Sequence, residues 1–195
     1  MPLPITNRFD GRFKRFICLG TGCLAFLLIL AGCPDRREIK FTGKTMGTTY
    51  HMTIVGSHFT AVAPLQKAVD ERLEAINASM STYRPDSEIS RFNQMQRIDT
   101  PLPNSTAFQE VMRVSRKLFR MTRGAWDGTL DPLIDLWGFG RTQRSKDRAP
   151  TAEEIQALLP AVGFHHIVLH ADGQLSKRQS SVSLDLASVA KGYAV

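Results

Sequence analysis

All three cysteines of this 195-residue chain, Cys18, Cys23 and Cys33, lie within its first 33 residues. The residues that follow, about 160 of them, therefore have no thiol with which to form a disulfide or a thiolate metal site. A segment of that length is enough for one domain with its own core, and hydrophobic residues make up 43% of the chain. We expect a domain held together by apolar packing, in which no cysteine acts as a nucleophile.

The N-terminal segment has the pattern of an export signal. A basic start precedes an apolar run, Phe16 to Leu30, and two small residues, Ala31 and Gly32, follow it. Cys33, directly after Ala-Gly, resembles the lipobox cysteine of bacterial lipoproteins, where the signal is removed and the sulfur carries a diacylglycerol. The alternative is a short membrane helix that stays attached, but the run has about 15 residues and a span needs roughly 20.

This pattern divides the chain into three segments. Residues 1–32 are predicted to be a lipoprotein signal peptide, residues 33–44 the lipidated cysteine and a polar tether, and residues 45–195 the folded domain. We expect the protein in the bacterial cell envelope, lipid-anchored to the membrane and facing the periplasm or the outside.

The charge of the chain excludes one class of partner. Residues 1–32 account for +3 of the net charge of +7, and the remaining basic residues are spread along the sequence. Nucleic-acid binding would need a basic stripe with stacking aromatics, and an exported protein meets no nucleic acid. A mildly basic surface is better suited to anionic lipid or a phosphate ligand.

Two other chemistries lack support. The chain has no Gly-x-Ser-x-Gly motif and no nucleophilic cysteine after the signal, so a hydrolase triad is not expected. On a strand, His166 and His170 would stand about 13 Å apart, which argues against a zinc site.

Hydrophobic periodicity predicts helices and strands in an irregular order. The predicted elements are a strand over 48–55, helices over 63–77, 105–121 and 151–159, strands over 166–170 and 182–186, and a helix from Ala187. The third helix opens with a capping box at Thr151 and Glu154. Because there is no strict βαβ alternation, the order favours the α+β class.

Three loops carry most of the residues suited to ligand binding. Residues 79–93 combine hydroxyls and charges with Tyr83, whose ring could stack on a ligand. Residues 124–140 place tryptophans and acids between glycines, and residues 184–193 lead from the predicted strand into a helix start that favours phosphate. Residue types alone favour a capped turn for the first loop. They leave a plain structural role open for the other two.

Taken in order, five stretches resemble the FAD:protein FMN transferases of the ApbE family. They are Met46–Tyr50, Ser81–Asn93, Gly124–Asp127, Leu136–Gly140 and Asp185–Val195. The resemblance implies a single mixed-sheet α+β domain, of which residues 45–195 are the N-terminal portion. Family members usually continue into a segment that completes the metal site, and Val195 falls in the first turns of a predicted helix. We therefore expect that the C-terminal part is missing from this sequence.

The resemblance also implies an activity. Family members bind FAD and Mg²⁺ and transfer the FMN moiety to a threonine hydroxyl of a target flavoprotein, releasing AMP. The typical acceptor is a flavoprotein subunit of a membrane redox complex. Two alternatives are an FAD-binding lipoprotein without transferase activity and an FAD pyrophosphatase that gives FMN and AMP.

The family pattern assigns site residues but no catalytic base. The residues expected to contact FAD are Met46, Tyr83, Ala125, Trp126, Asp127, Asp185 and Lys191. Tyr83 is expected to pack on the ring system, and the backbone carbonyl of Ser188 to bind Mg²⁺. This chemistry is coherent, because a lysine and a divalent cation can neutralise the charge that develops on a breaking pyrophosphate.

Overall fold

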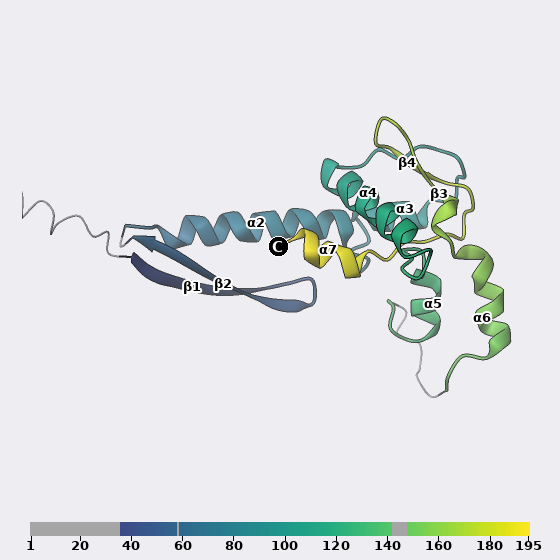
Figure 1. The fold of residues 1–195 in the computed structure, drawn as a ribbon, viewed down its shortest axis with the longest axis horizontal. Coiled ribbons are helices and arrows are strands. Elements are labelled where there is room, and N and C mark those ends of the chain that lie inside the picture. The colour runs from purple at the N-terminus through teal and green to yellow at the C-terminus, as the bar shows by residue number, and fades with distance from the viewer. Residues whose placement is uncertain (1–35, 58, 142–147) are drawn as a thin grey trace, which may run out of the picture. The chain divides into compact units, whose positions relative to one another are not determined.

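The structure is a computed structural model that describes residues 36–57, 59–141 and 148–195 (Figure 1). Cys33 and the predicted signal peptide lie outside these residues. The described residues belong to two compact units. The first is formed by residues 36–40, 52–57 and 59–62, and the second by residues 41–51, 63–141 and 148–195. None of the helices in the described ranges is long and apolar enough to cross a membrane.

The elements follow one another in the mixed order expected of the α+β class. They are β1 (Arg36–Thr45), β2 (Thr48–Ser57), α2 (Val62–Met80), α3 (Glu88–Gln94), α4 (Thr106–Met121), α5 (Asp131–Leu136), α6 (Ala152–Leu158), the 3₁₀ turns η1 (Leu159–Ala161) and η2 (Phe164–His166), β3 (Ile167–Leu169), β4 (Leu175–Lys177) and α7 (Ala187–Tyr193). Among the described residues the strands form two two-stranded sheets, β1 with β2 and β3 with β4, rather than the single mixed sheet that we expected. The α+β class itself is confirmed.

The prediction of a polar tether is wrong for residues 36–44, which form most of β1. Ile39 and Phe41 are buried and alternate with exposed neighbours, as in a strand with one covered face. The charged residues around them conceal this short alternation in the sequence. In the second unit, the Phe41 ring meets the Tyr50 ring edge-on, with centroids 6.4 Å apart.

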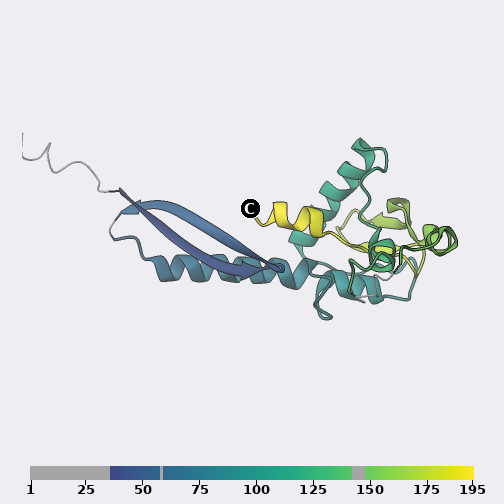
Figure 2. The ribbon, with the colours of Figure 1, turned by 90° about the horizontal axis from the view of Figure 1, so that it is seen from below.

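The core of the second unit joins α2, α3, α4 and α7 to the β3–β4 pair (Figure 2). Its largest fully buried apolar side chains include Phe92 of α3 and Phe108 of α4. β3 and β4 are antiparallel, with Ile167 opposite Lys177. These helices form a framework that holds the loops between them.

Side-chain hydroxyls cap the N-termini of three helices, α3, α4 and α6. Ser87 and Ser105 cap α3 and α4 by accepting the backbone N–H of Ser90 and Phe108, and the predicted capping box of Thr151 and Glu154 opens α6. Each cap satisfies an N–H that has no partner inside its own helix.

The predicted strand over 182–186 is wrong, because this segment pairs with no strand. Val182, Leu184 and Leu186 are fully buried, and the residues between them are partly exposed. Asn93 replaces the missing strand partner. Its Nδ2 donates to the carbonyl of Leu184 at 2.9 Å, and its Oδ1 accepts the N–H of Leu184 at 2.8 Å.

Candidate functional site

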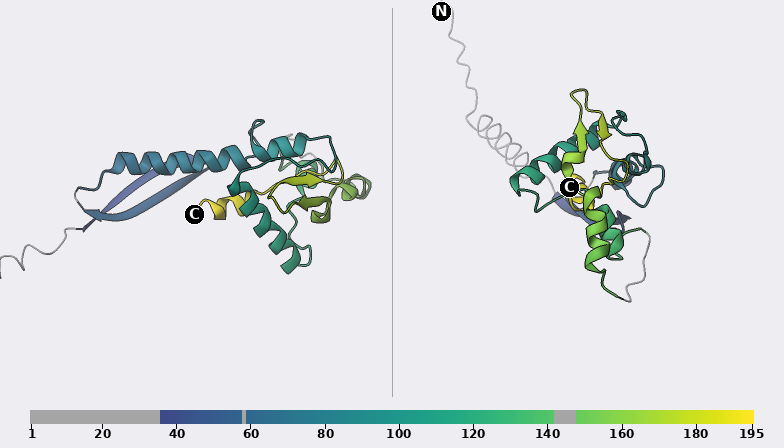
Figure 3. Two further views of the ribbon diagram at one scale, coloured as in Figure 1. Left: turned by 90° about the horizontal axis from the view of Figure 1, so that it is seen from above. Right: turned by 90° about the vertical axis from the view of Figure 1, so that its right-hand side faces the viewer.

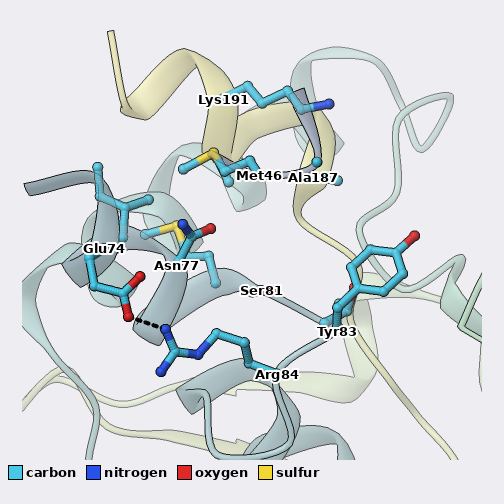
Figure 4. Close-up of a pocket in the computed structure, with 13 residues that line it drawn as sticks. Met46, Glu74, Asn77, Ser81, Tyr83, Arg84, Ala187 and Lys191 are labelled. Carbon is cyan, nitrogen blue, oxygen red and sulfur yellow. Dashed lines mark hydrogen bonds and ion pairs between the residues drawn. The ribbon is translucent and has the colours of Figure 1, made fainter. Parts of the chain in front are cut away.

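A cavity of about 660 Å³ opens within the second unit (Figure 4). This volume lies in the range of small-molecule sites. Three segments far apart in the sequence line it: the β1–β2 turn, the end of α2 with the loop after it, and one face of α7. The lining residues are Met46, Gly47, Glu74, Ile76, Asn77, Met80, Ser81, Thr82, Tyr83, Arg84, Ala187, Ala190 and Lys191.

The β1–β2 turn presents Met46 to the cavity in an unusual backbone conformation. Met46 and Gly47 have φ angles of 49° and 69°, as in the two-residue hairpin turns that match the twist of paired strands. Gly47 adopts this geometry without strain, whereas a side chain in the left-handed region costs roughly 1–2 kcal/mol. Strained residues of this kind cluster at functional sites, so the position of Met46 is consistent with ligand contact.

Two hydrogen bonds attach this turn to α2. Asn77 Nδ2 donates to Thr45 Oγ1 at 3.0 Å, and the Tyr50 hydroxyl donates to Asp70 Oδ1 at 2.6 Å. The bond to the Asp70 carboxylate raises the pKa of Tyr50 above its usual value. The turn is therefore held against the end of α2 that lines the cavity.

Ser87 fixes the loop that follows α2. Its Oγ lies 2.7 Å from the carbonyl of Ser81 and 3.0 Å from that of Arg84, and it also caps α3. The loop thus has a defined shape, yet the Tyr83 side chain within it is 75% exposed. A large aromatic ring that is exposed on a fixed backbone is available for stacking on a flat ligand.

The charged groups lie on opposite sides of the cavity in Figure 4. On one side Arg84 forms ion pairs with Glu74 and Asp86, and this guanidinium lowers the pKa of Asp86. On the other side Lys191 is exposed and has no ion pair with a described residue. Lys191 therefore offers a positive charge to an anionic ligand, while the charge of Arg84 is already balanced.

The helix α7 lies near α2 and α4 (Figure 3), and the Tyr193 side chain connects it to both of them. Its hydroxyl donates to Glu110 Oε2 at 2.9 Å and accepts from the Arg72 guanidinium at 3.4 Å. The Arg72 guanidinium also lies 5.7 Å from the centroid of the Tyr193 ring. These contacts fix the rotation of the helix, which keeps Ala187, Ala190 and Lys191 on the cavity side.

The fully buried side chain of Lys177 forms hydrogen bonds with the segment that leads into α7. Its Nζ donates to the carbonyls of Asn93, Ser180 and Val182 at 3.1, 2.9 and 3.0 Å. Burial lowers the pKa of Lys177 to about 8, because removing an ammonium group from water disfavours its charged form. Lys177 is a buried positive charge that carbonyl oxygens balance in the absence of a carboxylate.

The loop after α4 lies against the start of α7. Trp126 Nε1 donates to Ser188 Oγ at 3.1 Å, and the N–H of Asp185 donates to the carbonyl of Gly128 at 2.8 Å. A β-carbon at Gly128 would lie 3.2 Å from side-chain atoms of both Leu186 and Trp126. The two loops therefore pack closely, which explains the glycine at position 128.

The Asp127 carboxylate is engaged inside the protein. Oδ1 accepts from the N–H and hydroxyl of Thr129 at 2.8 and 2.7 Å, and Oδ2 accepts the N–H of Phe164 at 3.2 Å. The Thr129 hydroxyl oxygen in turn accepts the N–H of Gly163 at 2.6 Å. Asp127 thus ties the loop to the segment before β3, and its side chain positions the loop backbone.

The oxygen donors near the start of α7 fit Mg²⁺ only in part. Mg²⁺ prefers oxygen ligands in octahedral geometry, and Ser188 and Asp185 supply oxygens of this type. However, Asp185 Oδ1 already accepts the N–H of Ala187 at 2.7 Å, and the described residues contain no group of three or more His, Cys, Asp or Glu side chains suited to a metal. Further ligands would be needed to complete a site.

The buried carboxylate of Asp131 also has partners within the protein. Asp131 has a raised pKa, chiefly because it is buried, although a hydrogen bond from Ser183 and the charge of Arg141 oppose the shift. Arg141 lies 3.3 Å from Asp131 Oδ2. Asp131 therefore belongs to an internal ion pair at the start of α5.

The structure brings some of the sequence-predicted residues together and places others beside them. Met46, Tyr83 and Lys191 line the cavity. The others do not line the cavity. Trp126, Asp185 and Ser188 lie where the two loops meet, the Asp127 side chain ties its loop to the segment before β3, and Ala125 bonds within its own loop. Their predicted contacts with FAD and Mg²⁺ remain predictions.

Sequence reasoning missed the contribution of α2. Glu74 and Asn77 line the cavity together with Arg84. A polar pair three residues apart near the end of an otherwise amphipathic helix was the available signal. Lys177 gave no signal, since a lysine in a short strand is ordinarily read as solvent-exposed.

Comparisons with known proteins place this arrangement in a family. Residues 46–195 match the ApbE family. The FAD:protein FMN transferase of Vibrio cholerae is 41% identical over 174 residues, 88% of this chain and 51% of the relative. The corresponding protein of Haemophilus influenzae is 38% identical over 182 residues, 90% of this chain and 52% of the relative.

Solved structures agree with the sequence matches. The flavin transferase ApbE from Vibrio cholerae superposes with a TM-score of 0.78 at 37% identity, covering 83% of this chain and 52% of that one. The apo flavinyl transferase ApbE of Pseudomonas stutzeri gives 0.74 at 35% identity, over 82% and 52% of the two chains. The chain belongs to the ApbE family, and it spans about half the length of the relatives it matches.

Proposed function

We propose that this protein binds FAD in the cavity between the β1–β2 turn, the end of α2 and α7, and transfers the FMN moiety to a threonine hydroxyl of a target flavoprotein. The observation that supports this most directly is the convergence of Met46, Tyr83 and Lys191 on one cavity of about 660 Å³. The family pattern assigns all three to FAD. The relatives named above are themselves flavin transferases.

The chemistry of the cavity suits the parts of FAD. The apolar side chains of Met46 and Met80 and the exposed ring of Tyr83 offer surfaces for flat rings. Lys191 offers the positive charge that a pyrophosphate needs. Arg84, which is paired with Glu74 and Asp86, adds polar contacts without a second free positive charge.

In the proposed reaction, the threonine oxygen attacks the phosphorus that belongs to FMN. A new O–P bond forms, the bond between the FMN phosphorus and the bridging oxygen breaks, AMP leaves with that oxygen, and the hydroxyl proton passes to solvent water. Mg²⁺, when bound, supplies neutralisation of the charge on the pyrophosphate oxygens. Lys191 contributes to the same neutralisation from α7, while Tyr83 and the Met46 turn hold the flavin half in position.

The first experiment measures FAD binding to the protein expressed from its complete reading frame. Isothermal titration compares the wild type with Lys191→Met and with Lys67→Met, whose parent side chain is an exposed lysine of α2 outside the cavity. We expect Lys191→Met to weaken binding by roughly ten-fold or more, the scale of one hydrogen bond to a charged group, and Lys67→Met to leave it unchanged. Equal affinities for all three proteins would refute the assignment of this cavity to FAD.

A second experiment separates the transferase from its alternatives. The protein is incubated with FAD, Mg²⁺ and a membrane fraction containing flavoprotein redox complexes. AMP is then quantified, and covalent flavin on threonine is sought by in-gel fluorescence and mass spectrometry. AMP with flavinylated threonine supports the proposal. AMP with free FMN identifies a pyrophosphatase, and FAD binding without AMP release identifies a binding protein.

We also propose that Cys33 carries the lipid that anchors the protein in the bacterial envelope. The support is the order of basic start, apolar run and Leu-Ala-Gly-Cys at residues 30–33. Metabolic labelling with a fatty acid is expected to mark the wild type and not Cys33→Ala. Equal labelling of that variant would contradict the anchor site.

A further inference from the structure

The outer face of α4 carries four basic residues in a narrow arc. Successive residues of an α-helix are rotated by about 100°, so Arg113, Arg116, Lys117 and Arg120 fall within an arc of roughly 100°. The opposite side of the helix holds its buried residues, including Val111 and Ser115. The spread of basic residues along the sequence thus becomes a cationic face of α4, defined by these four side chains.

The cationic face is not neutralised by the protein. None of its members forms an ion pair with a residue in the described part of the chain, and the only hydrogen bond of their side chains there runs from Arg113 to Gln109 Oε1 at 3.4 Å. The one acidic residue of α4 is Glu110, at the edge of the arc, and its carboxylate accepts the hydroxyl of Tyr193 from α7. Helix-dipole compensation accounts for Arg120 in the last turn, but it does not account for the other three.

Apolar side chains border the same arc. Val114 and Met121 both lie about 80–100° from Arg113 around the helix, and they are 48% and 68% exposed. A row of cations beside exposed apolar side chains is the composition of surfaces that lie in the headgroup region of a bilayer. An acidic protein partner would match the charges but would give the apolar border less to contact.

We propose that the cationic face of α4 docks on the surface of an anionic phospholipid bilayer, with phosphatidylglycerol-type headgroups as its ligands. This docking is distinct from the proposed FAD site and from the proposed lipid at Cys33. It gives the folded domain a defined orientation on the membrane, which attachment at a single N-terminal point alone does not provide.

The test uses the full chain reconstituted in vesicles, so that its N-terminal segment attaches every variant equally. Energy transfer from Trp126 and Trp137 to a dansyl lipid reports how close the folded domain lies to the bilayer. The vesicles contain phosphatidylcholine alone or with about 30% phosphatidylglycerol, an anionic content that gives a surface potential of the kind that attracts basic segments. We expect higher transfer in the anionic vesicles and its loss at 0.5 M salt, where the screening length falls to about 4 Å.

Each basic residue near such a surface changes binding by about five-fold, so Arg113→Gln with Lys117→Gln should reduce the docked-to-undocked ratio by roughly 25-fold. The matched control, Lys67→Gln with Arg97→Gln, removes the same charge from exposed positions elsewhere. The control should behave like the wild type. The proposal would be overturned by equal energy transfer in both vesicle types, or by a loss of transfer in the control equal to that in the test variant. Salt-sensitive binding to an acidic protein, without any response to lipid, would also overturn it.

Discussion

Replacing Lys177 by methionine tests whether a buried, carboxylate-free ammonium group supports the segment that leads into α7. Methionine matches the length of the lysine stem but leaves the carbonyls of Asn93, Ser180 and Val182 without their donor. An unsatisfied buried acceptor costs about 1–3 kcal/mol, and relief of the lysine's own desolvation offsets part of the total. We expect Lys177→Met to lower the free energy of unfolding at pH 7 by about 2–4 kcal/mol.

The pH dependence gives a sharper test. The native pKa of Lys177 is about 8 and the ordinary value is 10.5, so between these values the unfolded chain holds a proton that the native protein has released. Stability from this group therefore rises with pH by up to ~1.4 kcal/mol per pH unit across that window. By pH 9.5 the free energy of unfolding of the wild type rises by at most about 2 kcal/mol relative to pH 7. The gain is an upper bound, because the three hydrogen bonds to carbonyls favour the charged form of Lys177.

Urea denaturation at pH 7 and pH 9.5 measures both effects. The gap between wild type and Lys177→Met should widen at pH 9.5, and the exposed control Lys67→Met should run parallel to the wild type at both values. A constant gap would show that the Lys177 pKa is not depressed, and a narrowing gap would show that it is raised. Either result refutes our account of this buried lysine.

Three further predictions concern the cavity and the loop beside it. Tyr83→Ala should weaken FAD binding by roughly 5- to 100-fold, the range of aromatic stacking energies, while Tyr83→Phe should keep most of it; unchanged titration of the alanine variant removes the stacking role. Met46→Gly should change the free energy of unfolding by less than ~1 kcal/mol, because relief of left-handed strain offsets added unfolded-state entropy, and FAD affinity should still fall. In Asp127→Asn, the side-chain amide can place an N–H donor opposite the N–H of Phe164, so the free energy of unfolding measured by urea denaturation should fall by about 1–3 kcal/mol. An unchanged midpoint would show that the bond to Phe164 contributes nothing.

Local features of the fold could be predicted because they depend on nearby residues. The predicted capping box at Thr151 and Glu154 involves groups within three residues of one another. The helix periodicities of α2 and α4 likewise need only the burial of one face. The family motifs then pointed to residues that the cavity does bring together, Met46 and Lys191 among them.

Features that depend on distant partners could not be predicted. Alternation over 182–186 indicated a strand, but Asn93, about ninety residues earlier, satisfies the backbone of this segment through its side chain. The role of Asn77 depends on the β1–β2 turn lying against α2. Neither pairing leaves a periodic trace in the sequence.

The cavity has a consequence for the order of events during folding. One wall comes from Met46 and another from Lys191, so the cavity cannot form until nearly 150 residues after the first wall are also available to fold. A ligand there binds only the completed domain and stabilises it by mass action, about 2.7 kcal/mol at a hundred-fold excess over Kd. Flavin supply in the compartment where the chain folds would then influence how much of the finished protein survives proteolysis.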